Sequence, residues 1–351
     1  MAKSPSLRTI GVIGAGTFGT AIANLLSRRA DEVLLFTRRT EKAERINRER
    51  RLHGIDLPTN ISIITDRAAF TQRCTLIYPV VPSTAFRAMM RTFASHLRPY
   101  HILIHGTKGF DLHIPEEAEQ DPDFKVGRRH INTMTEVIRQ ESVVVRVGCL
   151  AGPNLASEIL EGQPTATVIA SRFQEVIDLG QESLSTGNFH VFGTQQLLGA
   201  ELAGAMKNSI AIGSGILQGK GYGKNLQALL INRGLNEMIA IGRAMGATPH
   251  AFLGTAGIGD LVCTATSTKS RNFTFGTRLG GGDSVAEIKA SMPELAEGVR
   301  TLQFVRYLTQ HYGIQTPIHE MLYRVIYDGV DIDVAIKFLM RYPYVVDVDF
   351  L

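Results

Sequence analysis

Three glycines near the N-terminus limit this chain to a small set of folds. Gly14, Gly16 and Gly19 follow the apolar run 10–13 directly and precede an amphipathic pattern over 20–29. In such a strand, turn and helix, the first glycine permits a tight turn, the second a close approach to a pyrophosphate, and the third helix packing. The pattern predicts a dinucleotide-binding unit. The alternative is an ordinary strand-to-helix turn that is rich in glycine.

The end of the second predicted strand bears on the choice of cofactor. That strand, EVLLF at 32–36, is followed by Thr37, Arg38 and Arg39. An acidic residue here would bind the ribose hydroxyl of NAD, whereas arginine accommodates the 2′-phosphate of NADP. Arg38 and Arg39 therefore favour NADPH, with NADH as the alternative. One or both arginines can instead simply face solvent.

Apolar runs alternate with helical patterns through the first two hundred residues. The runs CTLIYPVV, HILIH, SVVVRVGCLA and PTATVIA each end near Gly, Pro, Ser or Asn, which is typical of a parallel sheet with crossover helices. Helical patterns then take over at 196–217, 225–246, 286–290 and 295–312. We expect an α/β fold: an N-terminal Rossmann-like doubly wound sheet at 1–193 that binds a dinucleotide, then an all-helical substrate and catalytic domain at 194–351.

Several residues follow predicted strands directly, where the ligands of a doubly wound sheet bind. Gly152 and Asn154 stand at one such place and are expected to line the ligand crevice. Lys108, beside Gly109, stands at another and can reach a phosphate or a cofactor ribose, the alternative being an exposed surface lysine. The charged segment 111–141 interrupts the alternation, and we interpret it as a crossover with a surface insertion.

One lysine of the helical half stands in unusual surroundings. Lys207 lies in the run ELAGAMKNSIAIGSGIL, and its neighbours at helical spacing are small and mostly apolar. Burying a charge costs several kcal/mol unless a partner compensates it. Lys207 therefore needs a partner, or its side chain must extend its ammonium group to solvent.

Two loops of the helical half carry further polar groups. Asp260 follows a glycine-rich run and stands where a phosphate loop would require lysine, which excludes that motif. Ser270 can cap a helix that begins after it, with Arg271 and Asn272 beside the positive end of that helix. This arrangement predicts an anion site. The alternative is a plain helix cap with an exposed arginine.

Composition argues against several other classes of protein. The net charge of +4 is spread along 351 residues, tryptophan is absent, and no basic and aromatic patch indicates nucleic acid. The three cysteines are far apart and the ten histidines are scattered, so we expect neither a disulfide framework nor a metal site. The N-terminus has no signal-like run and no uncharged apolar stretch reaches membrane length, so we expect a soluble, cytoplasmic protein.

Nine short motifs follow one another in an order that is more specific than any one of them. They are GVIGAGTFGTAIA, VVPSTAFR, GTKGF, AGPNLASEI, LAGAMKNSIAIGSGI, LINRGLNEM, GTAGIGDLVCT, SRNFTFG and LAEGVRT. Through them the chain resembles the NAD(P)-dependent glycerol-3-phosphate dehydrogenases of the bacterial type. The resemblance implies reversible reduction of a phosphorylated triose, dihydroxyacetone phosphate, to sn-glycerol 3-phosphate for phospholipid synthesis. We also expect a homodimer.

The resemblance implies roles for individual residues, with Lys207 as the catalytic acid/base and Asp260 as the second catalytic residue. The implied substrate-binding residues are Lys108, Gly152, Asn154, Lys207, Asp260, Ser270, Arg271 and Asn272. The implied cofactor-binding residues are Gly14, Gly16, Thr17, Phe18, Gly19, Arg38, Arg39, Lys108, Ala156, Arg271 and Glu297. Asn154 departs from the Ser or Thr that is frequent at this place in bacterial relatives, so the role of its side chain stays open.

Two other interpretations stay open at this point. A related two-domain enzyme with a helix lysine, such as a 3-hydroxyacid dehydrogenase or a ketopantoate reductase, would share the fold. The Ser-Arg-Asn triplet and the Gly-Asp-Leu loop argue against it. A non-catalytic NAD(P)-sensing protein would keep the glycine fingerprint and would have no need of Lys207, Lys108 and Asp260.

Overall fold

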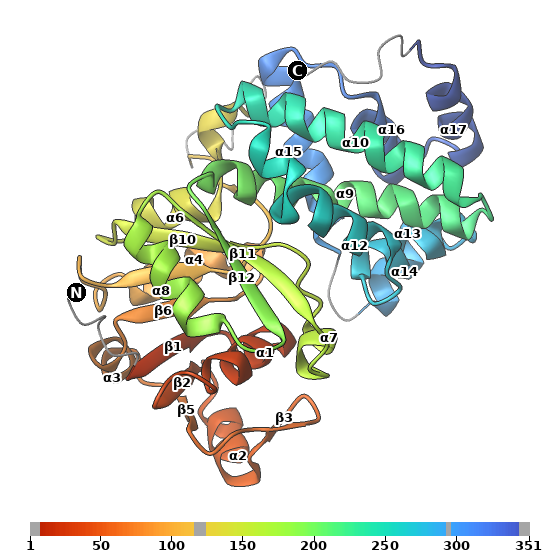
Figure 1. Ribbon diagram of the computed structural model, residues 1–351. Coiled ribbons are helices and arrows are strands. Elements are labelled where there is room, and N and C mark those ends of the chain that lie inside the picture. The colour runs from red at the N-terminus through yellow and green to blue at the C-terminus, as the bar shows by residue number, and fades with distance from the viewer. Residues whose placement is uncertain (1–7, 116–123, 293–295, 344–351) are drawn as a thin grey trace. The chain divides into compact units, whose positions relative to one another are not determined.

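The computed structural model describes residues 8–115, 124–292 and 296–343, and the chain divides into two compact units (Figure 1). The first unit comprises Met1–Thr107 and Met134–Leu197, and the second comprises Lys108–Thr133 and Leu198–Leu351. Residues 111–133 of the charged segment thus group with the helical unit, and residues 116–123 lie outside the described residues. The expected boundary after residue 193, and the roles given to the two domains, remain predictions.

Eight strands of the first unit form one sheet in the order β12-β11-β10-β7-β6-β1-β2-β5. Their bounds are β1 Thr9–Ile13, β2 Glu32–Phe36, β5 Ile61–Ile64, β6 Leu76–Pro79, β7 Ile102–His105, β10 Arg146–Ala151, β11 Thr165–Ser171 and β12 Phe189–Thr194. The neighbours pair in parallel except β10 with β11. Between these two the chain forms only α7 (Ala156–Leu160), whereas a parallel return needs a longer crossover. The expected parallel sheet therefore has one antiparallel pair.

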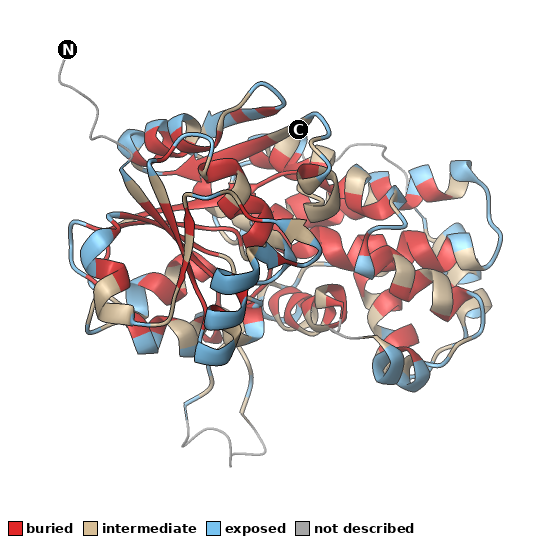
Figure 2. Cartoon of the chain, turned by 90° about the horizontal axis from the view of Figure 1, so that it is seen from below, coloured by how far each residue is buried: buried red, intermediate tan, exposed pale blue. Residues whose placement is uncertain are grey.

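Helices cover both faces of this sheet. Their bounds are α1 Thr17–Leu26, α2 Thr40–Glu49, α3 Arg67–Arg73, α4 Ser83–Phe93, α6 Met134–Glu141 and α8 Gln174–Leu184. One apolar cluster joins the sheet to α1 and α8, and includes Val12 and Ile22. The other joins it to α3, α4 and α6, and includes Phe70 and Phe86. Figure 2 shows the strands between them as buried. This is the doubly wound α/β architecture, and the predicted fold class is confirmed.

Two short antiparallel ladders complete the described strands. They are β3 (Arg51–Leu52) with β4 (Ile55–Asp56), and β8 (Asp111–Leu112) with β9 (Ile131–Asn132). The second ladder, followed along the chain by α6, lies within the charged segment, for which the sequence indicated no clean strand. Its two-residue strands are too short to give an alternating apolar pattern.

The regular secondary structure of the second unit in the described residues after 197 is helical, as the sequence predicts. Its helices are α9 Leu197–Gly219, α10 Lys224–Ala244, α11 His250–Leu253, α12 Asp260–Thr266, α13 Arg271–Gly280, α14 Val285–Ser291, α15 Glu297–Tyr312, α16 Pro317–Tyr327 and α17 Ile332–Arg341, with a π-helical turn at Thr255–Gly259. The two longest, α9 and α10, match the predicted patterns 196–217 and 225–246 closely.

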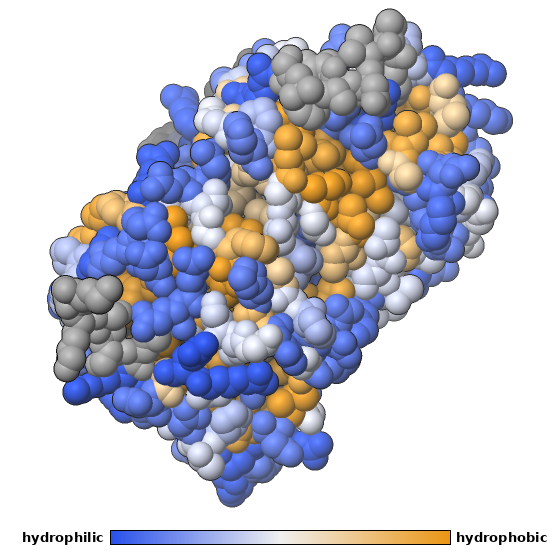
Figure 3. Space-filling model, in the orientation of Figure 1, coloured by the Kyte–Doolittle hydropathy of each residue, from blue (hydrophilic) through white to orange (hydrophobic). Residues whose placement is uncertain are grey.

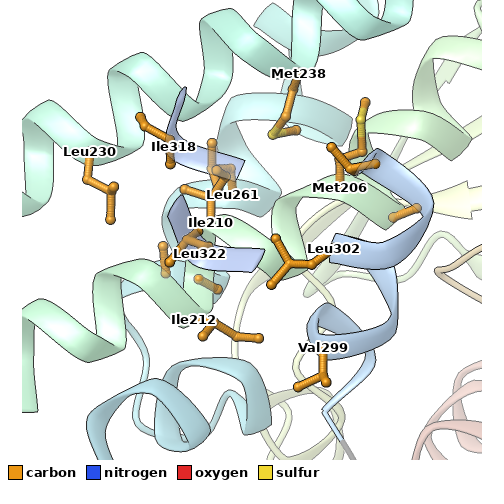
Figure 4. Close-up of a cluster of buried hydrophobic side chains, with 14 of the residues drawn as sticks. Met206, Ile210, Ile212, Leu230, Met238, Leu261, Val299, Leu302, Ile318 and Leu322 are labelled. Atoms are coloured by element: carbon orange, nitrogen blue, oxygen red, sulfur yellow. The ribbon is translucent and has the colours of Figure 1, made fainter. Parts of the chain in front are cut away.

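The centre of this unit is α9, in which every residue from 202 to 217 is buried. Its side chains Met206 and Ile210 pack among those of α10, α12, α15 and α16 (Figure 4). Glycine brings α13 unusually close, because a Cβ on Gly276 would lie 2.0 Å from the carbonyl oxygen of Ile212. A helix surrounded on all sides must be apolar or small all round, which explains the composition of the stretch that contains Lys207.

Candidate active site

The second unit buries a cluster of charged side chains around Asp260. Lys207, only 4% exposed on α9, donates hydrogen bonds to Oδ1 of Asp260 and to the hydroxyl of Thr264. Asp260, 1% exposed, also accepts a hydrogen bond at Oδ2 from Nζ of Lys108, at 2.6 Å. The structure thus brings together Lys207, Asp260 and Lys108, which stand far apart in the sequence.

The surroundings of Lys207 bring its pKa closer to neutral pH. Burial lowers the pKa of this lysine from 10.5 to about 8, because an ammonium group is poorly solvated inside the protein. The negative charge of Asp260 opposes that effect, and the positive charge of Lys108 adds to it. A proton donor whose pKa lies near the working pH is suited to general acid/base catalysis.

Local structure aims Asp260 and Thr264 at the lysine. The chain passes through the π-helical turn at Thr255–Gly259 and then enters α12, of which Asp260 is the first residue. Thr264 follows four residues later, so both side chains lie on one face of the helix. A carboxylate in the first turn is also stabilised by the helix dipole. This short helix therefore presents two hydrogen-bond acceptors, the carboxylate of Asp260 and the hydroxyl of Thr264, to Lys207 on α9.

The Ser-Arg-Asn triplet forms the beginning of α13. Oγ of Ser270 accepts a hydrogen bond from the backbone N–H of Phe273 at 3.3 Å, so the predicted cap is present. Arg271 is exposed at the first helical position. Asn272 is buried, and its Nδ2 donates to Oδ1 of Asn208 at 3.0 Å. The triplet thus splits into an exposed cation and a buried amide that ties α13 to α9.

Asn272 also fixes the start of α15. Its Oδ1 accepts a hydrogen bond from the backbone N–H of Gly298 at 2.9 Å. Gly298 has no room for a side chain, because a Cβ there would lie 2.4 Å from the carbonyl oxygen of Asn208. Glu297, the first residue of α15, is therefore held beside these contacts. The role of Asn272 in binding substrate remains a prediction, as does that of Glu297 toward the cofactor.

In the first unit, the glycine fingerprint forms the expected turn after β1. Gly14 has a φ of 121°, and a Cβ on Gly19 would lie 1.8 Å from the carbonyl oxygen of Gly14. Gly16 is the N-cap of α1, with no side-chain cap and nothing within 4 Å of the place where a Cβ would stand. The free N–H groups of the helix end and the open space above Gly16 fit the diphosphate of a dinucleotide.

Residues around the fingerprint stand in positions consistent with ligand binding. The chain begins α1 with Thr17 and Phe18, and Arg38 and Arg39 follow β2 on the surface. The turn at Gly152, with a φ of 115°, follows β10 at the same edge of the sheet as Gly14. Strand order reverses at β1, so this edge carries the topological switch point at which such sheets bind ligands.

Asn154 and Ala156 lie just beyond that turn. Nδ2 of Asn154 donates to the hydroxyl of Thr167 at 2.9 Å, while its Oδ1 is buried without a hydrogen-bond partner among the described residues. A buried acceptor of this kind is costly unless a ligand donor reaches it. Ala156 opens α7 and is half-buried. The ligand contacts expected of both residues remain predictions.

Two family models match the chain in succession. Residues 9–177 match the model described as the NAD-dependent glycerol-3-phosphate dehydrogenase N-terminus, and residues 196–337 match the corresponding C-terminus. The chain belongs to this family. The resemblance inferred from the nine motifs is thereby confirmed, in preference to a 3-hydroxyacid dehydrogenase or a ketopantoate reductase.

Members of the glycerol-3-phosphate dehydrogenase family resemble the chain over its whole length. A protein of Pseudomonas fluorescens named glycerol-3-phosphate dehydrogenase (NAD(P)+) is 37% identical and covers 98% of this chain and 97% of its own. A protein of the same name from Streptomyces griseus is 38% identical and covers 94% of this chain and 95% of its own. The crystal structure of glycerol-3-phosphate dehydrogenase from Coxiella burnetii superposes with a TM-score of 0.84 at 29% identity. The match covers 96% of this chain and 100% of that one.

The structure adds two residues to the site that the sequence motifs of the family did not single out. Thr264 binds the ammonium of Lys207, and Asn208 receives the amide of Asn272. Helical spacing from Asp260 would have indicated Thr264. Asn208 follows Lys207 directly, but its partner on α13 is visible only in the fold.

The described residues also bear on metal binding and on membrane insertion. Within residues 8–115, 124–292 and 296–343, no three or more His, Cys, Asp or Glu side chains gather as metal ligands would. The helices described there include none with the length and apolar character needed to span a membrane.

Proposed function

We propose that this chain is a glycerol-3-phosphate dehydrogenase, which reversibly reduces dihydroxyacetone phosphate to sn-glycerol 3-phosphate with NAD(P)H. The observation that carries the proposal is the buried cluster of Lys207, Asp260 and Lys108, in which one carboxylate faces two ammonium groups. The cluster has a net positive charge, which suits a substrate that carries a phosphate and develops negative charge on its carbonyl oxygen.

We assign the roles in this reaction as the family resemblance implies. The nicotinamide, when bound, supplies the hydride for carbon 2 of the substrate. Lys207 donates a proton to the oxygen on that carbon, and in the reverse direction its neutral amine accepts that proton. Asp260 holds the ammonium in place. Lys108, which binds the other oxygen of Asp260, is assigned to substrate and cofactor. A proton donor at the developing alkoxide contributes about 10²–10⁴-fold to the rate.

The phosphate group of the substrate is assigned to the start of α13. Arg271 is exposed there, at the positive end of the helix dipole, and Ser270 fixes that end by its cap. A guanidinium binds phosphate through charge-assisted hydrogen bonds. Gly152 and Asn154 are assigned to the substrate as well. The fingerprint residues, Ala156 and Glu297 are assigned to the cofactor, as the sequence indicates.

We assign NADPH as the preferred cofactor. The end of β2 carries no acidic residue to bind a ribose hydroxyl, and it places Arg38 and Arg39 on the surface. Arginine at this position favours a 2′-phosphate. Binding constants of NADPH and NADH, measured by calorimetry on the purified chain, test the assignment. Tighter binding of NADH would contradict it.

A homodimer and a cytoplasmic location complete the proposal. Apolar side chains are exposed on the helical unit, and Figure 3 shows a hydrophobic patch in the area of α10. Leu229 of α10 and Met340 of α17 are exposed and line one apolar pocket, and contiguous patches of this kind mark interaction surfaces. Light scattering on the purified chain should give twice the monomer mass. A monomer at every concentration would contradict the dimer.

A spectrophotometric assay tests the activity itself. The purified chain should oxidise NADPH when dihydroxyacetone phosphate is added, and should not do so with ketopantoate. The product should be sn-glycerol 3-phosphate, identified by its stereospecific reoxidation. A chain that binds either cofactor and turns over no dihydroxyacetone phosphate would refute the proposed function and would leave the NAD(P)-sensing alternative.

A further inference from the structure

Two side chains from outside the fingerprint meet at the carbonyl oxygen of Ala15, in the middle of the glycine turn. Nζ of Lys42, on α2, donates a hydrogen bond to this oxygen at 3.0 Å. Nε2 of His53, in the turn between β3 and β4, lies 3.1 Å from the same oxygen. The turn assigned to the diphosphate is therefore held by α2 and by this hairpin.

Lys42 is one of three cations along one face of α2. Arg39 is the N-cap of the helix, and Arg45 follows Lys42 by three residues. Partial burial lowers the pKa of Lys42, and the positive charges of Arg39 and Arg45 lower it further. Ion pairs nearby join Arg48 to Glu49 and Arg51 to Asp56, and the described residues include none that pairs Arg39, Lys42 or Arg45.

These cations begin at the end of α2 that attracts anions. The N-terminus of a helix is positive, so that acidic groups or bound anions stabilise it and cations do not. Arg39 gives α2 no side-chain cap, and the acidic residue in its first turn is Glu41. Glu41 offsets part of the positive potential at this end, and a bound dianion would offset more of it.

We propose that Lys42 is a specificity-determining residue, which together with Arg39 binds the 2′-phosphate of NADPH and joins that phosphate site to the glycine turn through Ala15. His53 is a positioning residue in this arrangement: it supports the same carbonyl and adds no ligand to the phosphate. The proposal rests on the proposed NADPH-dependent function, and it adds the residue on which the discrimination against NADH depends.

Binding measurements distinguish a phosphate ligand from a mere support of the turn. Lys42→Met keeps most of the side-chain length and removes the charge, whereas Arg48→Met makes the same change of charge on the same helix as a control. Calorimetry at fixed salt would use NADPH against NADH, and adenosine 2′,5′-bisphosphate against 5′-AMP. Lys42→Met should weaken NADPH and the bisphosphate at least about tenfold more than it weakens NADH and 5′-AMP, which lose only the support of Ala15.

Arg48→Met and His53→Ala serve as controls for charge and for support of the turn. Arg48→Met should leave all four dissociation constants within about twofold of the parent. His53→Ala should weaken NADPH and NADH by the same factor, since it removes support from Ala15 and no phosphate ligand. Circular dichroism and thermal unfolding without ligand establish that each variant is folded.

Three results would overturn the inference. Equal losses for NADPH and NADH in Lys42→Met would reduce the lysine to a support of the turn. A selective loss in Arg48→Met as large as that in Lys42→Met would show a general charge effect. An unchanged preference for NADPH over NADH in folded Lys42→Met would exclude Lys42 as a determinant of cofactor specificity. Each of these leaves the proposed function standing, whereas a parent chain that binds neither dinucleotide would refute that function instead.

Discussion

The carboxylate of Asp260 accepts a hydrogen bond from the ammonium of Lys207 in the interior of the helical unit. The other oxygen of the same carboxylate binds Lys108, so one negative charge is shared between two positive ones. The two ammonium groups lie where a phosphorylated ketone is proposed to bind. They can stabilise the negative charge that develops during reduction.

Replacing Lys207 by Met should abolish turnover and leave cofactor binding intact. The thioether cannot donate a proton to the developing alkoxide, so rates should fall at least about 10²-fold, with the dissociation constant of NADPH unchanged. Steady-state kinetics and calorimetry check this, and thermal unfolding at pH 7 establishes that the variant is folded. Turnover close to that of the parent in a folded variant would contradict the role of Lys207.

The two directions of the reaction should respond oppositely to pH around 8. Reduction requires Lys207 as an ammonium group, so its kcat should be level at lower pH and fall as pH rises through about 8. Oxidation of glycerol 3-phosphate requires the neutral amine, so its kcat should rise over the same interval. NADPH binding measured across the same pH range serves as the control. Parallel profiles in both directions would exclude Lys207 as the titrating group.

Changing the charges around Lys207 should move the pH at which kcat for reduction falls. This alkaline limb of the pH profile should move in a direction that depends on the charge removed. Asp260→Asn removes the charge that raises the pKa of Lys207, so the limb should move to lower pH, with a large loss of kcat. Lys108→Met removes a charge that lowers this pKa, so the limb should move to higher pH. Full pH profiles of kcat for both variants provide the measurement. Shifts of the same sign in both would contradict the assignment.

Arg271→Ala should act mainly on substrate binding. Loss of charge-assisted hydrogen bonds to the phosphate should raise KM for dihydroxyacetone phosphate about tenfold to a hundredfold. Arg278→Ala is the matched control, because Arg278 lies on the same helix and pairs with Asp283. It should leave KM within about twofold of the parent. If the two variants behave alike, Arg271 does not bind the phosphate.

The predictions from sequence succeeded where a local pattern carries the physical information. The glycine fingerprint fixed a strand, a turn and a helix, because Gly14 and Gly19 tolerate backbone geometry and contacts that a side chain would prevent. The run around Lys207 indicated a buried helix, because α9 is enclosed on all sides. Ser270 as a helix cap was equally local. The antiparallel pairing of β11 was missed, because direction depends on how far the short α7 connection can carry the chain.

By itself the sequence determined the fold class, the family and the identity of the residues that bear charge, since each of these follows from neighbours along the chain. Only the tertiary structure decided which of those charges meet. Asp260 is shared by Lys207 and Lys108, Asn272 turns inward to Asn208, and Lys42 reaches Ala15. These contacts join residues on different elements, and a hydrogen bond or a Coulomb interaction depends on distance in space and not on separation in sequence.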